Sequence, residues 1–346
     1  MARVRPQSMT GGGFNMKLSW FRGLGIALLA VVAFAMIACG GDNDAPGSAG
    51  DDFTDDPTPI QGLATVSEFP VEIPRSDGKT LTVEEPPTAI VSLSPAATEI
   101  IFALGAESSL IAVDNQADFP DAAKDVAKKV DAYEPNIEAI AGLDPDLVIV
   151  ANNSSGIVEK LDQLDIPVFY QDIDQDIQSV TDVFGQITLL GKVTGRGAQA
   201  ETLLNGLGDR LKVIEDGVQD ADASTGPRIY HELDSTFFTV SDDTFIGDLY
   251  RILRVRNIAG SGGGSAYPQM TQEAIIAANP SIIILADEEF GVTVDSVKAR
   301  PGWSVIEAVQ TDQIFGIDPD VISRPGPRII DALEQLAKLI YPERFQ

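Results

Sequence analysis

Two glutamates occupy the same position in a segment that the chain contains twice. Residues 137–150 read IEAIAGLDPDLVIV, residues 272–285 read QEAIIAANPSIIIL, and Glu138 and Glu273 are the second residues of the two copies. Each copy has the pattern of a helix, a turn and a buried strand. If each copy lies in one of two related lobes, the chain presents two carboxylates at a fixed separation.

Both glutamates are predicted to lie in the first turn of a helix. Each stands two residues after a residue that favours the helix N-cap, Asn136 before Glu138 and Thr271 before Glu273. One interpretation is that each carboxylate stabilises its helix dipole, which contributes about 0.3 to 1 kcal/mol. The other interpretation is that the pair docks onto arginines of a partner protein.

Polar and aromatic residues follow several predicted strands, where ligands bind in open α/β sheets. Tyrosines at such positions offer a flat apolar face and a hydroxyl group. For each residue the alternative is a loop side chain that packs against its neighbours or faces water. The candidates for the lining of a ligand cleft are Ser94, Gln116, Tyr133, Asn152, Asn153, Tyr267 and Arg324.

The sequence lacks the usual patterns of catalytic and metal sites. His231 is the only histidine, which excludes a multi-histidine zinc site and the H-E-x-x-H motif, and it is interpreted as structural. There is no G-x-S-x-G elbow, no EF-hand spacing of carboxylates, and no Lys-Ser/Thr after the glycines of residues 260–265. We therefore expect no catalytic residue, no metal site and no cofactor of the protein's own.

The residues near the start of the chain have the layout of an export signal. Lys17 and Arg22 precede an apolar run over residues 23–37, which is short for a membrane-spanning helix. Cys39 follows an Ile-Ala pair, the position at which a lipoprotein signal is cleaved and lipid-modified. The alternative is an ordinary signal followed by a buried cysteine. We interpret residues 1–39 as a lipoprotein signal whose Cys39 anchors the protein to the extracytoplasmic face of the cell membrane.

The composition excludes several function classes. A chain of 346 residues with 44% hydrophobic residues is expected to form about two domains with sizeable cores. The formal net charge of −28 would repel phosphates, so nucleic acid is not an expected partner. Because Cys39 is the only cysteine, no disulfide within the chain and no thiolate metal site can form. Residues 40–66, rich in Gly, Asp, Pro and Ser, are predicted to be a disordered tether.

Short β-branched runs alternate with helical patterns in two parts of the chain. Residues 67–173 begin with a hairpin around an Asp-Gly pair and continue with AIVSL, LIAV, DLVIV and PVFY. Residues 174–194 have helical spacing and are predicted to form a long linker helix, with a second helix after Gly195. Strand patterns resume in residues 195–346 with RIYHEL, SIIIL and QIFGI. The predicted fold is α/β, with two βα lobes that hold parallel sheets, a linker helix and a ligand cleft between the lobes.

Six segments carry a resemblance to a known family. They span roughly residues 80–342 and read TLTVEEPPTAIVSLSPAATEIIFALGA, NIEAIAGLDPDLVIV, TFIGDLYRILRVRNIAG, AYPQMTQEAIIAANPSIIIL, RPGWSVIEAV and SRPGPRIIDALEQLAKLI. In this order they resemble the substrate-binding proteins of ABC importers for vitamin B12, ferric siderophores and haem, the group with a rigid helical linker. The resemblance implies a monomer that binds a cobalt corrinoid or an iron chelate and delivers it to a permease dimer and its ATPase.

The resemblance also implies roles for individual residues. Glu138 and Glu273 would pair with arginines of the two permease subunits. Tyr267 precedes a Pro-Gln pair, the position of an aromatic residue that stacks on the corrin in B12-binding members. Tyr133 lies where the first lobe of the family contributes its own cleft aromatic.

Several alternatives remain open. Gln116 and the pair Asn152-Asn153 stand where B12 binders can have large aromatic side chains, so a corrinoid, a siderophore and haem are all possible ligands. Arg324 and Arg328 either meet an anionic chelate or cap the last strand and the last helix. A ligand-sensing lipoprotein would share the same fold, whereas an extracellular enzyme is disfavoured because no nucleophile, base or metal set is present.

Overall fold

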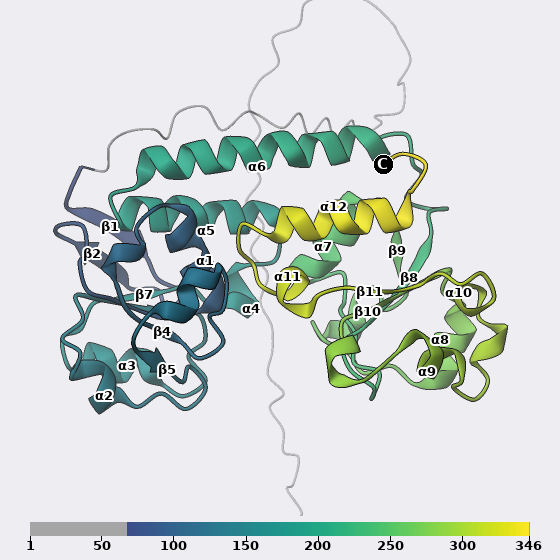
Figure 1. Ribbon diagram of the computed structural model, residues 1–346, viewed down its shortest axis with the longest axis horizontal. Coiled ribbons are helices and arrows are strands. Elements are labelled where there is room, and N and C mark those ends of the chain that lie inside the picture. Colours follow the sequence, from purple (N-terminus) through teal and green to yellow (C-terminus); the bar gives the residue numbers. More distant parts are fainter. Residues whose placement is uncertain (1–67, 346) are drawn as a thin grey trace, which may run out of the picture. The chain divides into compact units, whose positions relative to one another are not determined.

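The first lobe is built on a five-stranded parallel sheet (Figure 1). The structure is a computed structural model that describes residues 68–345. The predicted signal, Cys39 and the predicted tether lie outside these residues. The strand order is β5-β4-β3-β6-β7. The strands are β3 (Ile90–Leu93), β4 (Leu110–Asp114), β5 (Lys129–Val130), β6 (Leu147–Val150) and β7 (Val168–Tyr170). The helices that follow β3, β5 and β6 are α1 (Pro95–Ala103), α2 (Ile137–Ala141) and α3 (Ile157–Asp162).

The predicted hairpin precedes this lobe. Strands β1 (Val71–Pro74) and β2 (Thr80–Val83) pair antiparallel, and Gly78 adopts a φ of 80° that favours glycine. Because Pro74 pairs with Thr80, the connection is longer than the two-residue turn that the Asp-Gly pair suggests. Ile73 and Leu81 are buried in the same core as the helices that follow.

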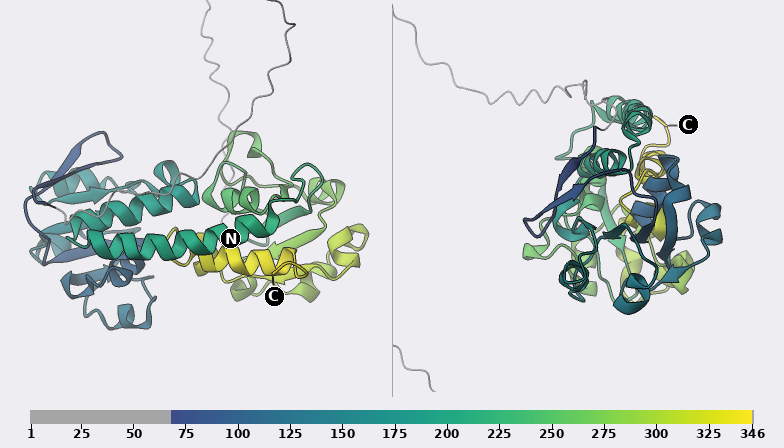
Figure 2. Two further views of the ribbon diagram at one scale, coloured as in Figure 1. Left: turned by 90° about the horizontal axis from the view of Figure 1, so that it is seen from above. Right: turned by 90° about the vertical axis from the view of Figure 1, so that its left-hand side faces the viewer.

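Two consecutive helices lie between the lobes in the sequence. They are α5 (Val180–Val193) and α6 (Gly197–Val218), which pack against each other and are separated by Gly195 at a φ of 69° (Figure 2). Helix α5 begins at Val180 because Ser179 caps it by accepting a hydrogen bond from the Asp182 backbone N–H. The residues before it form a separate short helix, α4 (Ile173–Asp176). Helix α5 packs on both α1 and α7, and α6 packs on α12, so these two helices join the lobes.

The sheet of the second lobe has the strand order of β4-β3-β6-β7 in the first lobe and, within the described residues, has no counterpart of β5. This parallel sheet has the order β9-β8-β10-β11. The strands are β8 (Arg228–Glu232), β9 (Arg256–Asn257), β10 (Ile282–Leu285) and β11 (Ile314–Gly316). The helices are α7 (Phe245–Ile252), α8 (Gln272–Ala278), α9 (Val294–Lys298), α10 (Glu307–Gln310), α11 (Pro319–Ser323) and α12 (Ile329–Ile340). Short 3-10 helices occur in both lobes at Glu107–Ser109, Asp121–Asp125, Gly262–Gly264, Glu288–Phe290 and Trp303–Val305.

The strands confirm the predicted α/β fold. Strands β3, β6, β7 and β10 are buried along their whole length, as expected for parallel sheets covered on both faces. Within residues 68–345 no helix is long and apolar enough to cross a membrane.

Candidate ligand and docking sites

The repeated segment forms the same structure in both lobes. Each copy begins with a short helix, α2 or α8, and continues into a strand at the centre of its sheet, β6 or β10. Between helix and strand, Asp144 and Asn279 both adopt a left-handed conformation, with φ of 54° and 48°, and a proline follows each of them. The two glutamates are therefore held by equivalent backbones.

Glu138 and Glu273 lie where the sequence places them. Asn136 caps α2 by accepting a hydrogen bond from the Ala139 backbone N–H at 3.0 Å, and Thr271 caps α8 in the same way at 3.2 Å. Both glutamates are in the first helical turn and exposed. In the part of the chain that the structure describes, neither carboxylate takes part in an ion pair, so both are available to a partner.

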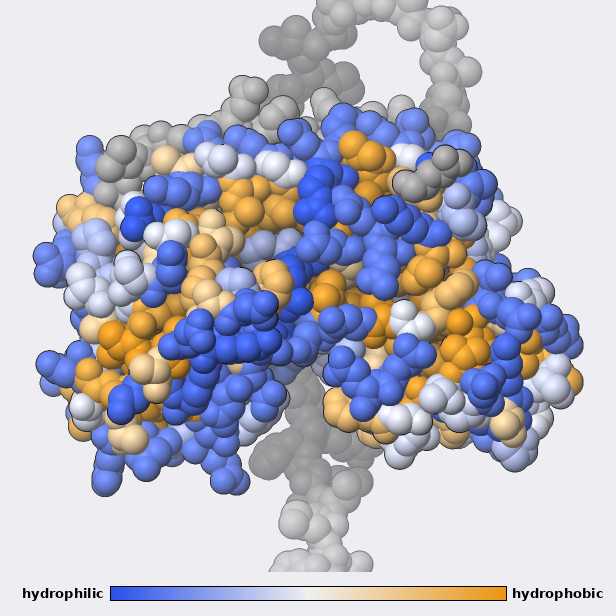
Figure 3. All heavy atoms as spheres, in the orientation of Figure 1, coloured by the Kyte–Doolittle hydropathy of each residue, from blue (hydrophilic) through white to orange (hydrophobic). Residues whose placement is uncertain are grey.

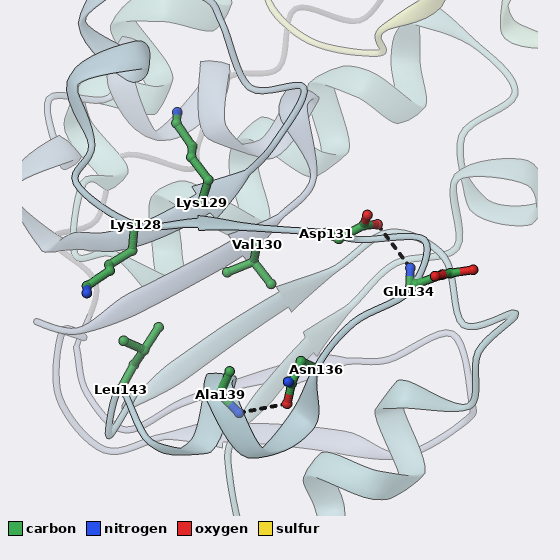
Figure 4. Close-up of a pocket in the computed structure, with 8 residues that line it drawn as sticks. All are labelled: Lys128, Lys129, Val130, Asp131, Glu134, Asn136, Ala139 and Leu143. Atoms are coloured by element: carbon green, nitrogen blue, oxygen red, sulfur yellow. Dashed lines mark hydrogen bonds between the residues drawn. The ribbon is translucent and has the colours of Figure 1, made fainter.

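A pocket adjoins the helix that carries Glu138 (Figure 4). It has a volume of about 350 Å³ and lies between β5 and α2. Val130, Ala139 and Leu143 give it an apolar side, and the hydrogen bonds from Ala139 to Asn136 and from Glu134 to Asp131 hold its rim. The surface beside Glu138 is thus hollowed.

Residues beyond the carboxyl ends of the two sheets approach each other. Arg324, after β11, donates a hydrogen bond to the backbone oxygen of Gln116, after β4, at 3.0 Å. Tyr267 of the second lobe lies near Asp174, after β7 of the first lobe, and burial together with this carboxylate raises the pKa of the Tyr267 phenol. On the face drawn in Figure 3 the surface has a notch between the parts that hold α2 and α8. A ligand cleft between the lobes would lie at these strand ends.

The two candidate tyrosines differ in exposure. Tyr133 has 82% of its surface exposed, in a loop whose backbone N–H groups at Tyr133 and Glu134 donate to Asp131. Tyr267 is 38% exposed, so part of its side chain is packed against the protein and part is open to solvent. Tyr267 is therefore the more buried of the two tyrosines.

Two exposed aromatic residues also follow strands of the second lobe, and the sequence analysis missed them. Phe238 is 38% exposed and pairs with Gln269 across an antiparallel bridge, so it lies on the segment next to Tyr267. Phe290 is 80% exposed and follows β10. Both stand in loops beyond the strand ends, where the sequence alone does not show whether an aromatic side chain is exposed or packed on the core.

The polar candidates of the first lobe make local hydrogen bonds. Ser94 is buried and caps α1 by accepting a hydrogen bond from the Ala97 backbone N–H. Asn153 accepts a hydrogen bond from the Val158 backbone N–H and donates to Glu159, which holds the start of α3. Asn152 and the side chain of Gln116 are exposed. These local bonds account for Ser94 and Asn153, and their contact with a ligand stays a prediction.

Arg324 lies in an ion-pair cluster that joins the lobes. Its guanidinium is 2.6 Å from Asp118 of the first lobe, 2.6 Å from Asp320 and 3.6 Å from Glu99. Burial by itself would raise the pKa of the Asp118 carboxyl. The hydrogen bond and the charge of Arg324 outweigh burial, so the pKa of Asp118 is lowered. Arg328 donates to both oxygens of Glu99 and lies over the ring of Phe119 at 4.1 Å. The cluster gives both arginines structural contacts, and a further contact of Arg324 with a ligand stays a prediction.

His231 is buried in β8. Its Nδ1 is 2.6 Å from the Tyr250 hydroxyl oxygen, and burial lowers its pKa to about 3, so the ring is neutral. Among the described residues no three His, Cys, Asp or Glu side chains are grouped to hold a metal ion. The histidine packs in the core of the second lobe and has the contacts expected of a structural residue.

Comparisons with known proteins agree with this architecture. The chain matches the periplasmic binding protein family over residues 90–321. An ABC transporter substrate-binding lipoprotein of Bacillus subtilis is 32% identical over 282 residues, which are 80% of this chain and 88% of that protein. A cobalamin-binding protein of Halobacterium salinarum is 28% identical, covering 79% of this chain and 74% of that protein.

A solved structure has the same fold. It is that of a possible iron-binding, periplasmic solute-binding protein from Staphylococcus epidermidis, which is 28% identical and superposes with a TM-score of 0.64. The similarity covers 74% of this chain and 100% of that chain. With two lobes of matching strand order and a family match over most of its length, the chain belongs to the periplasmic binding proteins.

Proposed function

We propose that the protein is the substrate-binding lipoprotein of an ABC importer, which captures a corrinoid or an iron chelate between its lobes and delivers it to a permease. The observation that carries this proposal is the pair Glu138 and Glu273, exposed on equivalent helices of two related lobes. Two similar permease subunits would each meet one glutamate through an arginine. The relative from Bacillus subtilis, which is named an ABC transporter substrate-binding lipoprotein, supports this partner.

The preferred ligand is a corrinoid. Tyr267 and Phe238 lie on neighbouring segments beyond the strand ends of the second lobe, and two partly exposed rings suit a large flat ligand. The cobalamin-binding relative supports this choice, and the possible iron-binding protein supports an iron chelate as the second candidate. Tyr133, Gln116, Asn152 and Arg324 are proposed as further contacts on or near the cleft rim.

The protein carries its ligand without chemical change in this proposal. A transported cobalt or iron centre would enter with the chelate, and the protein would contribute apolar and polar contacts. The ATPase of the importer would supply the energy for release and transport.

The proposed location is the extracytoplasmic face of the cell membrane. Cys39, outside the described residues, would carry the acyl chains, and residues 40–66 would link it to the lobes. The tether gives the lobes freedom to reach the permease.

Calorimetric titration of the purified protein tests the ligand. Cyanocobalamin, haemin and several ferric siderophores are added in turn, and we expect saturable binding of cyanocobalamin at a ratio of one to one. If only a siderophore binds, the proposed ligand becomes an iron chelate and the corrinoid is rejected. Failure of all these probes to bind would reject the proposed ligand classes.

A further inference from the structure

A group of buried side chains lies at the carboxyl ends of β8 and β10. Glu232, the last residue of β8, is fully buried, and both of its oxygens accept hydrogen bonds from Arg300, at 2.5 and 2.6 Å. The guanidinium of Arg300 also lies 4.5 Å from the ring centre of Trp303 and 5.3 Å from that of Phe237. Arg300 is therefore fully engaged by Glu232 and the two rings.

Asp287 places a second carboxyl group in this cluster. It is 1% exposed, and neither of its oxygens has a hydrogen-bond donor among the described residues. Leu285 pairs with Glu232 in the sheet, and Ala286 donates its backbone N–H to the Glu232 backbone oxygen at 2.9 Å. Asp287 therefore follows directly on a residue bonded to Glu232, and the charge of Glu232 acts on its carboxyl group.

A proton stabilises two neighbouring carboxyl groups that are both buried. The charged and titratable groups that face Asp287 are Glu232 and Tyr230 from β8 and Arg300 from the segment after α9. One arginine neutralises only one of two carboxylates, and burial makes a second charge costly. Burial first, and then the charge of Glu232, raise the pKa of Asp287 to about 7. A protonated Asp287 can donate to Glu232, which satisfies both groups.

Asp287 also lies near the start of the loop over residues 286–291, which carries Phe290. Its backbone oxygen accepts hydrogen bonds from the N–H groups of Phe290 at 3.0 Å and Val292 at 3.4 Å. Val292 is buried at the far end of the loop, whereas Phe290 at its tip is 80% exposed. An exposed phenylalanine at the carboxyl end of a parallel strand is placed where ligands of such sheets bind.

We propose that the loop over residues 286–291 belongs to the ligand-capturing surface, with Phe290 as its contact side chain, and that a proton shared by Asp287 and Glu232 holds the loop in place. The ligand contact rests on the proposed function, whereas the proton-dependent hold on the loop does not. Asp287 acts as a positioning residue, because its side chain faces the core and reaches the ligand only through the loop.

The raised pKa of Asp287 determines how the stability of the closed loop depends on pH. In an open loop Asp287 would have an ordinary pKa near 3.8, whereas in the closed loop its pKa is raised to about 7. The proton therefore stabilises the closed loop fully below the lower value, and this stabilisation is lost as the pH rises to about 7. Above that pH the loop should show no further change.

Hydrogen exchange tests the hold on the loop without any ligand. After correction for intrinsic rates, protection of the Phe290, Gly291 and Val292 amides should fall by up to about a hundredfold between about pH 5 and pH 8. Asp287→Asn supplies a permanent donor to Glu232 and should keep the protection constant over this range. Asp295→Asn, an exposed acid in α9, is the control and should behave as the unmodified protein. Protection that does not change with pH in the unmodified protein, or a pH response that survives in Asp287→Asn, would overturn the shared proton.

Calorimetry with cyanocobalamin tests the contact of Phe290. At about pH 6, where the loop is held, Phe290→Ser should weaken binding about fivefold or more. Leu164→Ser is the control, since Leu164 is 51% exposed between α3 and β7, at the opposite end of a sheet, and should leave binding unchanged. Equal binding by Phe290→Ser and the unmodified protein would remove Phe290 from the ligand surface. If the unmodified protein binds no chelate, the proposed function fails together with the contact, and hydrogen exchange still decides on the shared proton.

Discussion

Arg328 donates two hydrogen bonds to Glu99, at 2.9 and 2.5 Å, and thereby joins the start of α12 to the middle of α1. The two residues come from different lobes and are 229 positions apart in the sequence. Glu99 is 3% exposed, and Arg324 lies 3.6 Å from the same carboxylate. A single buried carboxylate therefore joins two arginines of the second lobe to the first.

Removing this carboxylate should destabilise the protein strongly. Glu99→Ala leaves the guanidinium of Arg328 without its buried partner, and we expect the free energy of unfolding to fall by about 3 kcal/mol. Glu107→Ala, an exposed glutamate of the same lobe, is the control and should change it by less than about 0.5 kcal/mol. Urea denaturation followed by circular dichroism measures both variants. Equal stability of the two would show that the pair contributes nothing to the fold.

The glutamates of α2 and α8 should matter for transport and not for folding. Glu138→Ala and Glu273→Ala are each expected to reduce uptake into vesicles that contain the cognate permease, because an arginine of the permease would lose its partner. The double variant should abolish uptake, while each substitution changes the free energy of unfolding by less than about 0.5 kcal/mol. Asp295→Ala is a matched control, since Asp295 has the same position in α9 after the N-cap Thr293. Full transport by the double variant would leave both glutamates with only their helix-dipole role.

Tyr267 should contribute to ligand affinity. Tyr267→Ala is expected to weaken binding of the transported chelate by about 1 to 3 kcal/mol, the effect of losing an aromatic anchor. The melting temperature of the Tyr267→Ala protein should change little, because the Tyr267 ring is only partly buried. Val213→Ala removes an exposed apolar side chain from α6, away from the strand ends, and serves as the control in the same titration. An unchanged dissociation constant for Tyr267→Ala would exclude the ring from the site.

The lipid anchor can be tested by fractionation. Cys39→Ala removes the proposed acylation site, so the protein should leave the membrane fraction while its lobes stay folded. Immunoblots of washed membranes and of the released fraction, with circular dichroism of the released protein, measure both expectations. Retention of the variant on membranes after a high-salt wash would contradict the lipoprotein assignment.

The repeated segment could be predicted in detail because its determinants are local. The N-caps Asn136 and Thr271 bond to residues three positions away, and Asp144 and Asn279 are residue types that tolerate a left-handed turn before proline. The buried β-branched runs of β6 and β10 likewise identify parallel strands without knowledge of their neighbours.

Contacts between distant residues could not be predicted in the same way. Nothing near Arg324 in the sequence indicates that Asp118, 206 positions away, lies 2.6 Å from it. Ser94 illustrates the opposite problem, because a serine after a strand suits both a ligand contact and a helix cap, and the structure shows the cap. In the sequence Asp287 is one of many acidic residues, and only the pairing of β8 with β10 brings it near Glu232.

The clasp of Glu99, Arg324 and Arg328 has a consequence for the kinetics of ligand exchange. If these ion pairs hold the lobes at one spacing, capture requires little rearrangement, and a ligand that fits should bind at a rate limited by its encounter with the open cleft. Release would then require the contacts between ligand and cleft to break while the lobes keep this spacing. We therefore expect the residence time of the ligand to be set by the permease, which can separate the lobes only by working against this clasp.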